Sequence, residues 1–245
     1  MSFERLENLN NQVAVVTGAA GGVGFATIKQ LSASGAKIVA VIRSNVDEMQ
    51  AKLNDLGTGH IAVLADVTKR DQLATIVASL SQCDILVNCA GSSKIIPHKM
   101  LNNLSDELFD EILSTNLRAV FTVVSVFAPL LAVSQNGLIV NIGSAAAIRT
   151  GGSNIAYAAA KAGLESMTRN LAVALAPTRV ITISPSALDT GFVDLPAEAY
   201  GKIAAATPLK RCGTPDDIAN AVQACATTLR FMTGNTIVVD GGRTL

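Results

Sequence analysis

Tyr157 and Lys161, a tyrosine and a lysine four residues apart, form the pattern in this chain with the clearest chemical meaning. Residues four apart on a helix lie on one face, so the two side chains should point in the same direction. A phenol has a pKa of about 10, and a nearby ammonium group favours the phenolate and lowers that value. The pair could therefore exchange a proton with a carbonyl or alcohol oxygen. Such pairs are also common on solvated helix faces, so this interpretation needs support from elsewhere in the chain.

A glycine-rich segment near the other end of the chain supplies part of that support. An apolar run, Val13 to Val16, leads into Thr17 to Gly24 with the sequence TGAAGGVG, and a helical apolar pattern follows. Glycines let a backbone approach a ligand closely, and the amides at a helix N-terminus attract phosphate. The segment departs from the GxGxxG fingerprint and follows TGxxxGxG instead. We expect a pyrophosphate-binding turn here, with an ordinary tight turn as the alternative.

Strands and helices are expected to alternate along the whole chain, without a linker or an internal repeat. Apolar runs indicate seven strands, near residues 13–17, 37–42, 60–64, 84–88, 137–142, 179–184 and 236–240. Helices are expected to begin near Gly24, Val46, Lys69, Ser105, Asn116, Ile155 and Thr214. Continuous apolar strands separated by helices are typical of a parallel sheet covered on both faces. Residues 1–245 are therefore predicted to form one α/β domain with a Rossmann-type, doubly wound parallel sheet.

Chemically useful residues follow five of the predicted strands, at the carboxyl ends where doubly wound sheets bind ligands. In chain order they are Gly18, Asp66, the segment Asn88 to Gly91, Ser144 and Pro185. Each has a plain structural explanation when taken alone, because such residues also cap helices, hold turns or satisfy backbone groups. Their coincidence at one edge of the sheet favours a shared site.

Together these motifs resemble the single-domain short-chain dehydrogenase/reductase family, and the likeness covers nearly the whole chain. Further marks of the family are Asn116, Thr233-Gly234 and the segment Val239 to Gly242. The 3-oxoacyl-carrier-protein reductases and the polyol or sugar dehydrogenases are the most similar members. The resemblance implies an NAD(P)-dependent oxidoreductase that transfers hydride between nicotinamide and a carbonyl or secondary alcohol.

The resemblance also implies roles for individual residues. Tyr157 would be the general acid in reduction and the general base in oxidation, and Ser144 would hydrogen-bond the carbonyl oxygen. Lys161 would lower the tyrosine pKa and bind the nicotinamide ribose, while Asn116 would hold a water that links Lys161 to solvent. The cofactor-binding residues would be Gly18, Ala20, Gly21, Gly22, Val23, Gly24, Arg43, Ser44, Asp66, Val67, Asn88, Ala90, Gly91, Tyr157, Lys161, Pro185, Leu188 and Thr190.

The end of the second strand bears on the choice of cofactor. NAD enzymes place an acid there to bind the ribose 2′-hydroxyl. In this chain Ile42 stands at that place and Arg43 follows it, and a guanidinium matches a 2′-phosphate in charge and geometry. Ser44 could add a hydrogen bond, but Gly21 is not the second basic residue of some NADP enzymes. NADP is therefore favoured over NAD.

Composition excludes several other classes of function. Nineteen basic and nineteen acidic residues cancel and there is no Trp, which argues against nucleic-acid binding. Four cysteines without CxxC spacing and two histidines argue against metal sites and disulfides, as in a cytoplasmic protein with reduced thiols. The polar segment Met1 to Asn11 does not resemble a signal peptide. The apolar stretch Ala119 to Val133 is interrupted by polar residues and is interpreted as a buried helix rather than a membrane span.

The substrate is predicted only as a class. Residues 191–211 are expected to form a mobile flap over the pocket, with apolar side chains at Phe192, Leu195, Tyr200, Ile203 and Leu209. These suit a moderately apolar ketone such as a 3-oxoacyl thioester, while a sugar or a cyclic ketone stays open. His98 and Arg149 are candidate pocket residues, with a solvated loop position as the alternative.

The chain departs from the family pattern at three positions. Cys89 replaces an asparagine, Ser186 a glycine and Ile181 another asparagine, and none of them belongs to the catalytic set. The resemblance implies a homotetramer built through the helices that begin near Asn116 and Ile155 and through the last strand. A non-catalytic nucleotide sensor and the longer epimerase branch of YxxxK proteins are the alternative functions.

Overall fold

Seven parallel strands form one sheet in the computed structural model, which describes residues 8–193 and 196–245. The strands lie in the order β3-β2-β1-β4-β5-β6-β7. Their bounds are β1 Val13–Thr17, β2 Lys37–Ile42, β3 Ile61–Leu64, β4 Ile85–Asn88, β5 Leu138–Ile142, β6 Arg179–Pro185 and β7 Thr236–Val239. The predicted fold class is confirmed, and each predicted strand lies within one residue of its observed bounds.

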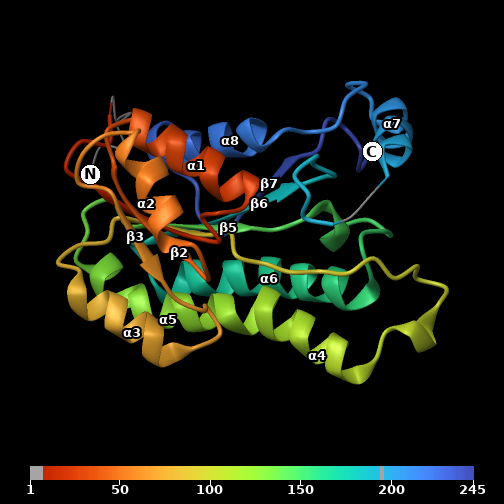
Figure 1. Ribbon diagram of the computed structural model, residues 1–245, viewed down its shortest axis with the longest axis horizontal. Coiled ribbons are helices and arrows are strands. Elements are labelled where there is room, and N and C mark those ends of the chain that lie inside the picture. The colour runs from red at the N-terminus through yellow and green to blue at the C-terminus, as the bar shows by residue number, and fades with distance from the viewer. Residues whose placement is uncertain (1–7, 194–195) are drawn as a thin grey trace.

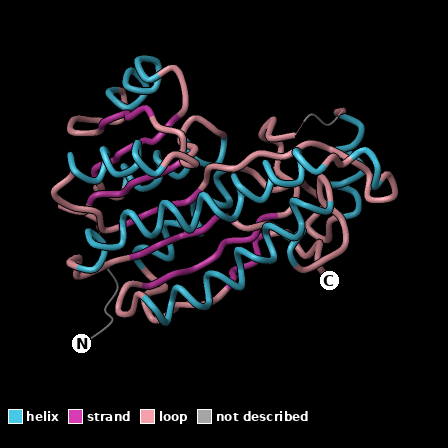
Figure 2. The backbone as a smooth tube through the Cα atoms, turned by 90° about the horizontal axis from the view of Figure 1, so that it is seen from below, coloured by secondary structure: helices cyan, strands magenta, loops and turns pink. Residues whose placement is uncertain are grey.

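Helices cover both faces of this sheet, as Figure 1 shows. One layer contains α1 (Gly22–Ala33), α2 (Val46–Asn54) and α8 (Pro215–Thr227), whose apolar residues belong to one core cluster. The opposite layer contains α3 (Arg70–Ser79), α5 (Ala119–Ala132) and α6 (Ile155–Ala174). Figure 2 shows the strands running between helices seen from below. A sheet buried on both faces explains the continuous apolar runs in its strands.

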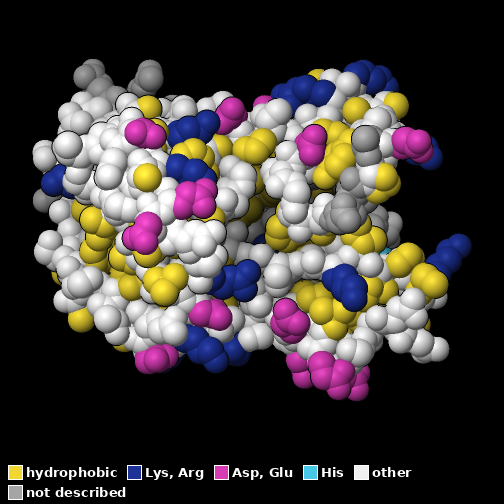
Figure 3. Space-filling model, viewed as in Figure 1, with side chains coloured by type: hydrophobic (Ala, Val, Ile, Leu, Met, Phe, Trp, Pro, Cys, Tyr) yellow, Lys and Arg dark blue, Asp and Glu magenta, His cyan; other side chains and the backbone are white. Residues whose placement is uncertain are grey.

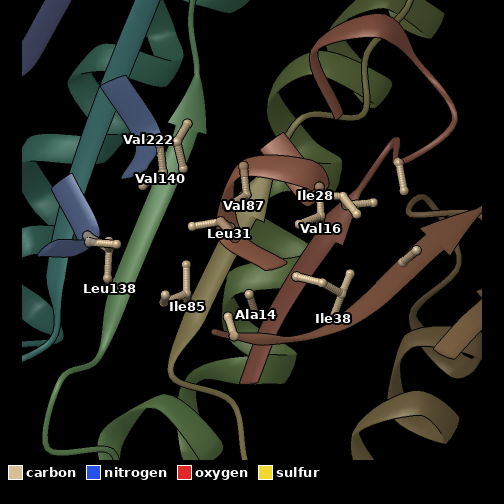
Figure 4. Packing of buried hydrophobic residues seen from close by; sticks show 14 of the residues in the cluster. Ala14, Val16, Ile28, Leu31, Ile38, Ile85, Val87, Leu138, Val140 and Val222 are labelled. Atoms are coloured by element: carbon tan, nitrogen blue, oxygen red, sulfur yellow. The ribbon is translucent and has the colours of Figure 1, made fainter. Parts of the chain in front are cut away.

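The two core clusters hold the sheet between its helical layers. Figure 4 shows the first, in which Ile28 and Leu31 of α1 and Val222 of α8 pack on strand residues. Phe127 of α5 and Leu164 of α6 are fully buried in the second cluster. Burial of this kind stabilises a fold by roughly 25 cal/mol per Å² of apolar surface removed from water. The strands, and therefore their carboxyl ends, are fixed by packing from both sides.

The helix before β5 is longer than the sequence indicates. α4 (Asp106–Leu113) continues through a π-helical turn, Ser114–Arg118, into α5 without a break. The expectation of a separate helix starting near Asn116 is wrong, because the wider turn keeps the helical path. Within the described residues, this run, Asp106–Ala132, has the length and composition of a membrane span. Its α5 half packs on β4, β5 and α3, which is the placement of a core helix.

The segment between β6 and α8 contains a helix that the sequence analysis did not predict. α7 spans Ala197–Ala206 within the predicted flap of residues 191–211, and Leu195 lies outside the described residues. Figure 1 places α7 beside the C-terminal end of the chain. The predicted start of α8 is confirmed: the Thr214 hydroxyl accepts from the amide of Asp217, and the Asp217 carboxylate accepts from the amide of Thr214.

Candidate active site

A cavity of about 940 Å³ lies at the carboxyl ends of the strands, within the usual size range of small-molecule sites. Figure 3 shows the surface hollowed near the middle of one face, with hydrophobic side chains along the hollow. Most of the predicted site residues line the cavity: Gly18, Ala20, Gly21, Gly22, Val23, Arg43, Ser44, Asp66, Val67, Ala90, Gly91, Ser144, Tyr157, Lys161, Pro185, Leu188 and Thr190. Gly24, Asn88 and Asn116 are not part of the lining, although the sequence placed them in the site.

The glycine-rich turn requires glycine at Gly18. Its φ of +64° is unfavourable for other residues, and an added Cβ would lie 2.7 Å from the Cα of Ala90. The Thr17 hydroxyl accepts hydrogen bonds from the amides of Cys89 (3.2 Å) and Ala90 (3.3 Å), so the ends of β1 and β4 are held together. A Cβ on Gly24 would collide with the carbonyl oxygen of Gly18. Gly24 therefore packs the turn tightly without lining the cavity.

The N-terminus of α1 opens onto the cavity without a side-chain cap. Gly21 is the N-cap residue and makes no side-chain hydrogen bond. The first amides of an α-helix have no partner within the helix, and Gly22 and Val23 line the cavity. Exposed amides and the positive end of the helix dipole bind phosphate groups. The turn therefore fits the pyrophosphate of a dinucleotide.

Two charged residues lie at the far side of this turn. Arg43 is exposed and lines the cavity immediately after β2, where Ile42 is buried in the core. Asp66 follows β3 and accepts hydrogen bonds from the amide and the hydroxyl of Thr68, both at 2.8 Å. The backbone hydrogen bond from Thr68 is the main cause of a lowered pKa of Asp66. This end of the cavity therefore offers both a cation and an ionised carboxylate.

Ser144, Tyr157 and Lys161 meet at the other side of the turn. Tyr157 lies in the first turn of α6, where its amide donates to the side chain of the N-cap residue Asn154 at 2.8 Å. Asn154 also donates to the carbonyl oxygen of Lys94, which anchors the start of the helix. The Ser144 hydroxyl lies close enough to the Tyr157 phenol to lower its pKa. Lys161 lies one turn further along α6 and is only 5% exposed.

The environment of Lys161 and Tyr157 changes the expected acid–base behaviour. The Lys161 ammonium donates to the carbonyl oxygen of Ile142 at 2.7 Å and lies 5.6 Å from the centre of the tyrosine ring. Burial lowers the pKa of Lys161 to about 8. Burial raises the pKa of Tyr157 to about 12, although the Ser144 hydroxyl acts in the opposite direction. Burial therefore dominates the pKa of Tyr157 in this structure, and a lowering of that pKa by Lys161 stays a prediction.

Asn116 lies next to the cavity rather than on its wall. Asn116 belongs to the π-helical turn, and its side-chain amide donates to the carbonyl oxygens of Ser92 (2.8 Å) and Ile112 (2.9 Å). Its own oxygen is buried and has no hydrogen-bond partner among the described residues. A Cβ on Gly91 would lie 2.8 Å from that oxygen. The side-chain oxygen of Asn116 is therefore an unpartnered acceptor next to Gly91.

Asn88 has a structural position beneath the site. Its side-chain amide donates to Asn141 of β5 at 2.9 Å, and Asn141 donates in turn to the Thr168 hydroxyl of α6. This network joins β4, β5 and α6 in the core. The ends of β4 and β5 and the helix that carries Tyr157 are thereby held in register.

The three departures from the family pattern fit the structure differently. Cys89 lines the cavity, and burial raises the pKa of its thiol to about 12. Ile181 is fully buried in the core, where an apolar side chain is favourable. Ser186 also lines the cavity and is not among the described residues with positive φ. The backbone at Ser186 therefore has no conformational need for glycine.

The end of the cavity lined by Phe192, Ile203, Arg149 and Arg243, called the substrate end below, is formed by less regular segments. Phe192 lines it, with a ring centre 6.0 Å from that of Tyr157, and Ile203 of α7 lines it as well. Arg149 is also part of the lining, whereas His98 is not. Arg243, which was not predicted as a site residue, reaches the cavity from the C-terminal turn. No local pattern marks Arg243, because its neighbours in space come from α7 and from the segment after β5.

Known proteins share both the sequence and the fold. A family pattern described as enoyl-(acyl carrier protein) reductase matches residues 18–244. The 3-oxoacyl-acyl-carrier-protein reductase FabG of Thermotoga maritima is 31% identical, over 96% of this chain and 98% of that protein. The NAD-dependent glycerol dehydrogenase of Listeria innocua is 31% identical, over 99% of this chain and 98% of that protein.

A solved structure of a short-chain dehydrogenase/reductase has the same fold as this chain. The short-chain dehydrogenase/reductase from Serratia marcescens BCRC 10948 superposes with a TM-score of 0.87 at 27% identity, over 97% of this chain and 99% of that chain. The parallel sheet, the glycine-rich turn and the match over almost the whole length all indicate the same family. The chain is therefore an oxidoreductase of the short-chain dehydrogenase/reductase family.

Proposed function

We propose that this protein reduces a ketone, or oxidises the matching secondary alcohol, with NADP(H) as cofactor. The observation that carries the proposal is the convergence of Ser144, Tyr157 and Lys161 on the cavity that begins at the uncapped N-terminus of α1. One end of the cavity offers backbone amides for a pyrophosphate. The other offers oxygen-directed donors and a proton.

The chain's own residues would handle the proton and the developing charge. A bound reduced nicotinamide supplies the hydride that adds to the carbonyl carbon. Tyr157 gives its phenolic proton to the carbonyl oxygen, and its raised pKa keeps that proton in place at neutral pH. Ser144 donates a hydrogen bond to the same oxygen, where negative charge develops. In alcohol oxidation the proton moves in the reverse direction, from the hydroxyl to Tyr157.

Lys161 and Asn116 would support this proton transfer. The Lys161 ammonium is close enough to Tyr157 to favour the phenolate left after transfer, and it would also hold the nicotinamide ribose. The buried, unpartnered oxygen of Asn116 is an acceptor suited to a water molecule between Lys161 and solvent. The phenolate would thus regain a proton between turnovers.

Arg43 supports the choice of NADP. Its guanidinium is exposed at the end of β2, and no acidic side chain lies within ion-pair distance among the described residues. The neighbouring Ser44 also lines the cavity. A 2′-phosphate would neutralise this charge through paired hydrogen bonds. Use of NAD is the alternative, and the glycerol dehydrogenase relative is named as NAD-dependent.

A moderately apolar ketone such as a 3-oxoacyl thioester is the proposed substrate class. The apolar side chains of Phe192 and Ile203 line the cavity beside Tyr157, and one of the relatives is named as a 3-oxoacyl-acyl-carrier-protein reductase. Oxidation of a polyol or sugar is the alternative. A nucleotide sensor without chemistry is disfavoured, because all three catalytic side chains are present.

A homotetramer would cover apolar residues that the single chain exposes. Phe121 of α5 and Val173 of α6 are 50% and 81% exposed, and Val238 of β7 is 40% exposed. Two-fold symmetric contacts through α5 and α6 would bury Phe121 and Val173, and a second contact through β7 would bury Val238. Light scattering should give four times the mass of the 25.3 kDa chain. A monomer at micromolar concentration would contradict this assembly.

A substrate and cofactor panel tests the proposed activity. Purified protein is mixed with NADPH or NADH and with neutral ketones, 3-oxoacyl thioesters, polyols or sugars, and cofactor oxidation or reduction is followed by absorbance. We expect oxidation of NADPH on addition of a 3-oxoacyl thioester, with release of the oxidised cofactor. Cofactor binding without turnover of any substrate would instead support the sensor.

A further inference from the structure

Arg149 and Arg243 bring two positive charges to the substrate end of the cavity, and the proposed mechanism uses neither of them. Arg149 lies five residues after Ser144, and Arg243 lies in the turn at the C-terminal end. Both line the same cavity as Ser144 and Tyr157. Their positions place two guanidinium groups on the wall of the chamber that would receive the substrate.

Hydrogen bonds to main-chain oxygens hold the two arginines in place. Arg149 Nη1 donates to the carbonyl oxygen of Arg243 at 2.9 Å, and Arg243 Nη1 donates to the carbonyl oxygen of Ile203 at 3.1 Å. Each guanidinium has five N–H donors, so one such bond leaves most donors available. The arginines are therefore oriented by α7 and the C-terminal turn without losing their capacity to bind a ligand.

Neither arginine forms an ion pair with a carboxylate of residues 8–193 or 196–245. In the part of the chain that the structure describes, the two ion pairs within 4.0 Å are Lys52 with Glu48 and Arg211 with Asp217. Two cations that line one cavity without a paired carboxylate attract an anionic ligand. Guanidinium groups bind carboxylate and phosphate oxygens in matched pairs of hydrogen bonds.

The other charged residues on the cavity wall leave an excess of positive charge. Besides the two arginines, the described lining contains the cations Arg43 and Lys161 and the acids Asp66 and Glu111. Asp66 lies at the opposite end, after β3, and already accepts two hydrogen bonds from Thr68. Glu111 of α4 also lines the cavity, and among the described residues it forms no ion pair with either arginine.

We propose that Arg149 and Arg243 bind an anionic group of the substrate, either a carboxylate or a phosphate, while the reacting carbonyl lies at Tyr157. The apolar part of the substrate would pass Phe192 and Ile203. This inference rests on the proposed function and narrows its substrate class to oxo compounds that carry a negative charge away from the reacting carbon. The cofactor phosphates do not need these residues, because the glycine-rich turn and Arg43 provide for them.

Paired substrates with the same reacting group test the proposal. Acetoacetyl-coenzyme A is compared with the neutral acetoacetyl thioester of N-acetylcysteamine, and acetoacetate with its ethyl ester. Wild type should show a higher kcat/KM for the anionic member of at least one pair. Arg149→Gln and Arg243→Gln should each reduce that value about tenfold, equivalent to ~1.4 kcal/mol, and affect the neutral member far less. The affected pair distinguishes phosphate from carboxylate recognition.

Matched variants separate binding from structural support. Lys29→Gln removes an exposed cation of α1 outside the cavity lining and should change neither pair. Arg149→Lys keeps the charge and should retain part of the anionic preference. Equal losses on charged and neutral substrates, or no loss in either glutamine variant, would overturn the proposal. Thermal unfolding of each variant shows whether an equal loss comes from damaged structure.

A binding measurement keeps the proposal testable if no substrate is turned over. Calorimetry with protein saturated by oxidised cofactor should detect coenzyme A or acetoacetate binding more strongly than pantetheine or ethyl acetoacetate. The glutamine variants should remove that difference. Absence of any preference would contradict the anion site alone, whereas preferential binding without turnover of any substrate would contradict only the proposed function.

Discussion

The two ends of the cavity are built in different ways. At the cofactor end, the backbone of the β1–α1 turn and the uncapped start of α1 form the wall, and the sheet holds them in place. At the substrate end, the wall consists of side chains from α7, the segment after β5 and the C-terminal turn, joined by hydrogen bonds such as that of Arg149 with Arg243. The difference indicates that the first end is determined by the fold and the second by individual side chains.

Gly18→Val should produce the largest effect, because it changes the end that the fold determines. A branched side chain at φ +64° is strained, and its Cβ would lie 2.7 Å from Ala90. Strain of about 1–3 kcal/mol or more should lower the unfolding midpoint by about 5 °C or more and abolish cofactor binding. Calorimetric scans and NADPH titration measure both. Gly201→Ala, at an open position in α7, is the control and should retain both properties.

Ser144→Ala should lower kcat about 100-fold, because a hydrogen bond to the developing oxyanion is lost. Cofactor binding should stay unchanged, since the glycine-rich turn is not altered. Steady-state kinetics with saturating NADPH measures the loss, and Ser79→Ala on the exposed surface of α3 provides the control. A weaker cofactor affinity with normal kcat would mean that the two ends are not separable in this way.

Arg43→Gln should raise the KM for NADPH about tenfold and leave that for NADH nearly unchanged, because a charge-assisted hydrogen bond to the 2′-phosphate is worth about 1.5–3 kcal/mol. The ratio of kcat/KM values for the two cofactors measures the change. Lys29→Gln on the exposed surface of α1 should leave the ratio at its wild-type value. Equal effects on both cofactors would place the 2′-phosphate elsewhere.

A change of pH near neutrality should alter the rate of ketone reduction less than any of these substitutions. Lys161 has a pKa of about 8 in the folded protein, so its ammonium is present below that pH and is lost above it. Tyr157 keeps its proton until about pH 12. The value of kcat/KM for ketone reduction should therefore be level below pH 8 and fall above it. A profile that stays level to pH 10, with folding verified by circular dichroism, would contradict this assignment to Lys161.

The cofactor end could be predicted from sequence because its features are local. The apolar run of β1 and the glycines after it directly encode a strand, a turn and a helix. The helix start near Thr214 is equally local and is confirmed, with a capping box between Thr214 and Asp217. The alternation of elements also predicts a doubly wound parallel sheet, and in the structure the carboxyl ends of β1 and β4 lie side by side in it.

The substrate end could not be predicted in the same way. α7 is short and alanine-rich, and in sequence it resembles a loop with apolar residues. The position of Arg243 depends on contacts with Ile203, forty residues away. The raised pKa of Tyr157 depends on burial by distant segments, which the spacing of Tyr157 and Lys161 does not contain. Side chains brought together from separate elements leave no periodic pattern.

Tyr157→Phe tests most directly whether Tyr157 is the proton donor. It also tests whether cofactor binding at the other end of the cavity is independent of the tyrosine hydroxyl. The phenyl ring keeps the packing against Phe192 and removes only the hydroxyl. In one experiment, NADPH is titrated into the variant by fluorescence and a substrate of the wild type is then added. The predicted result is a near-normal dissociation constant with no measurable turnover. Substantial turnover by the variant would remove Tyr157 from the mechanism.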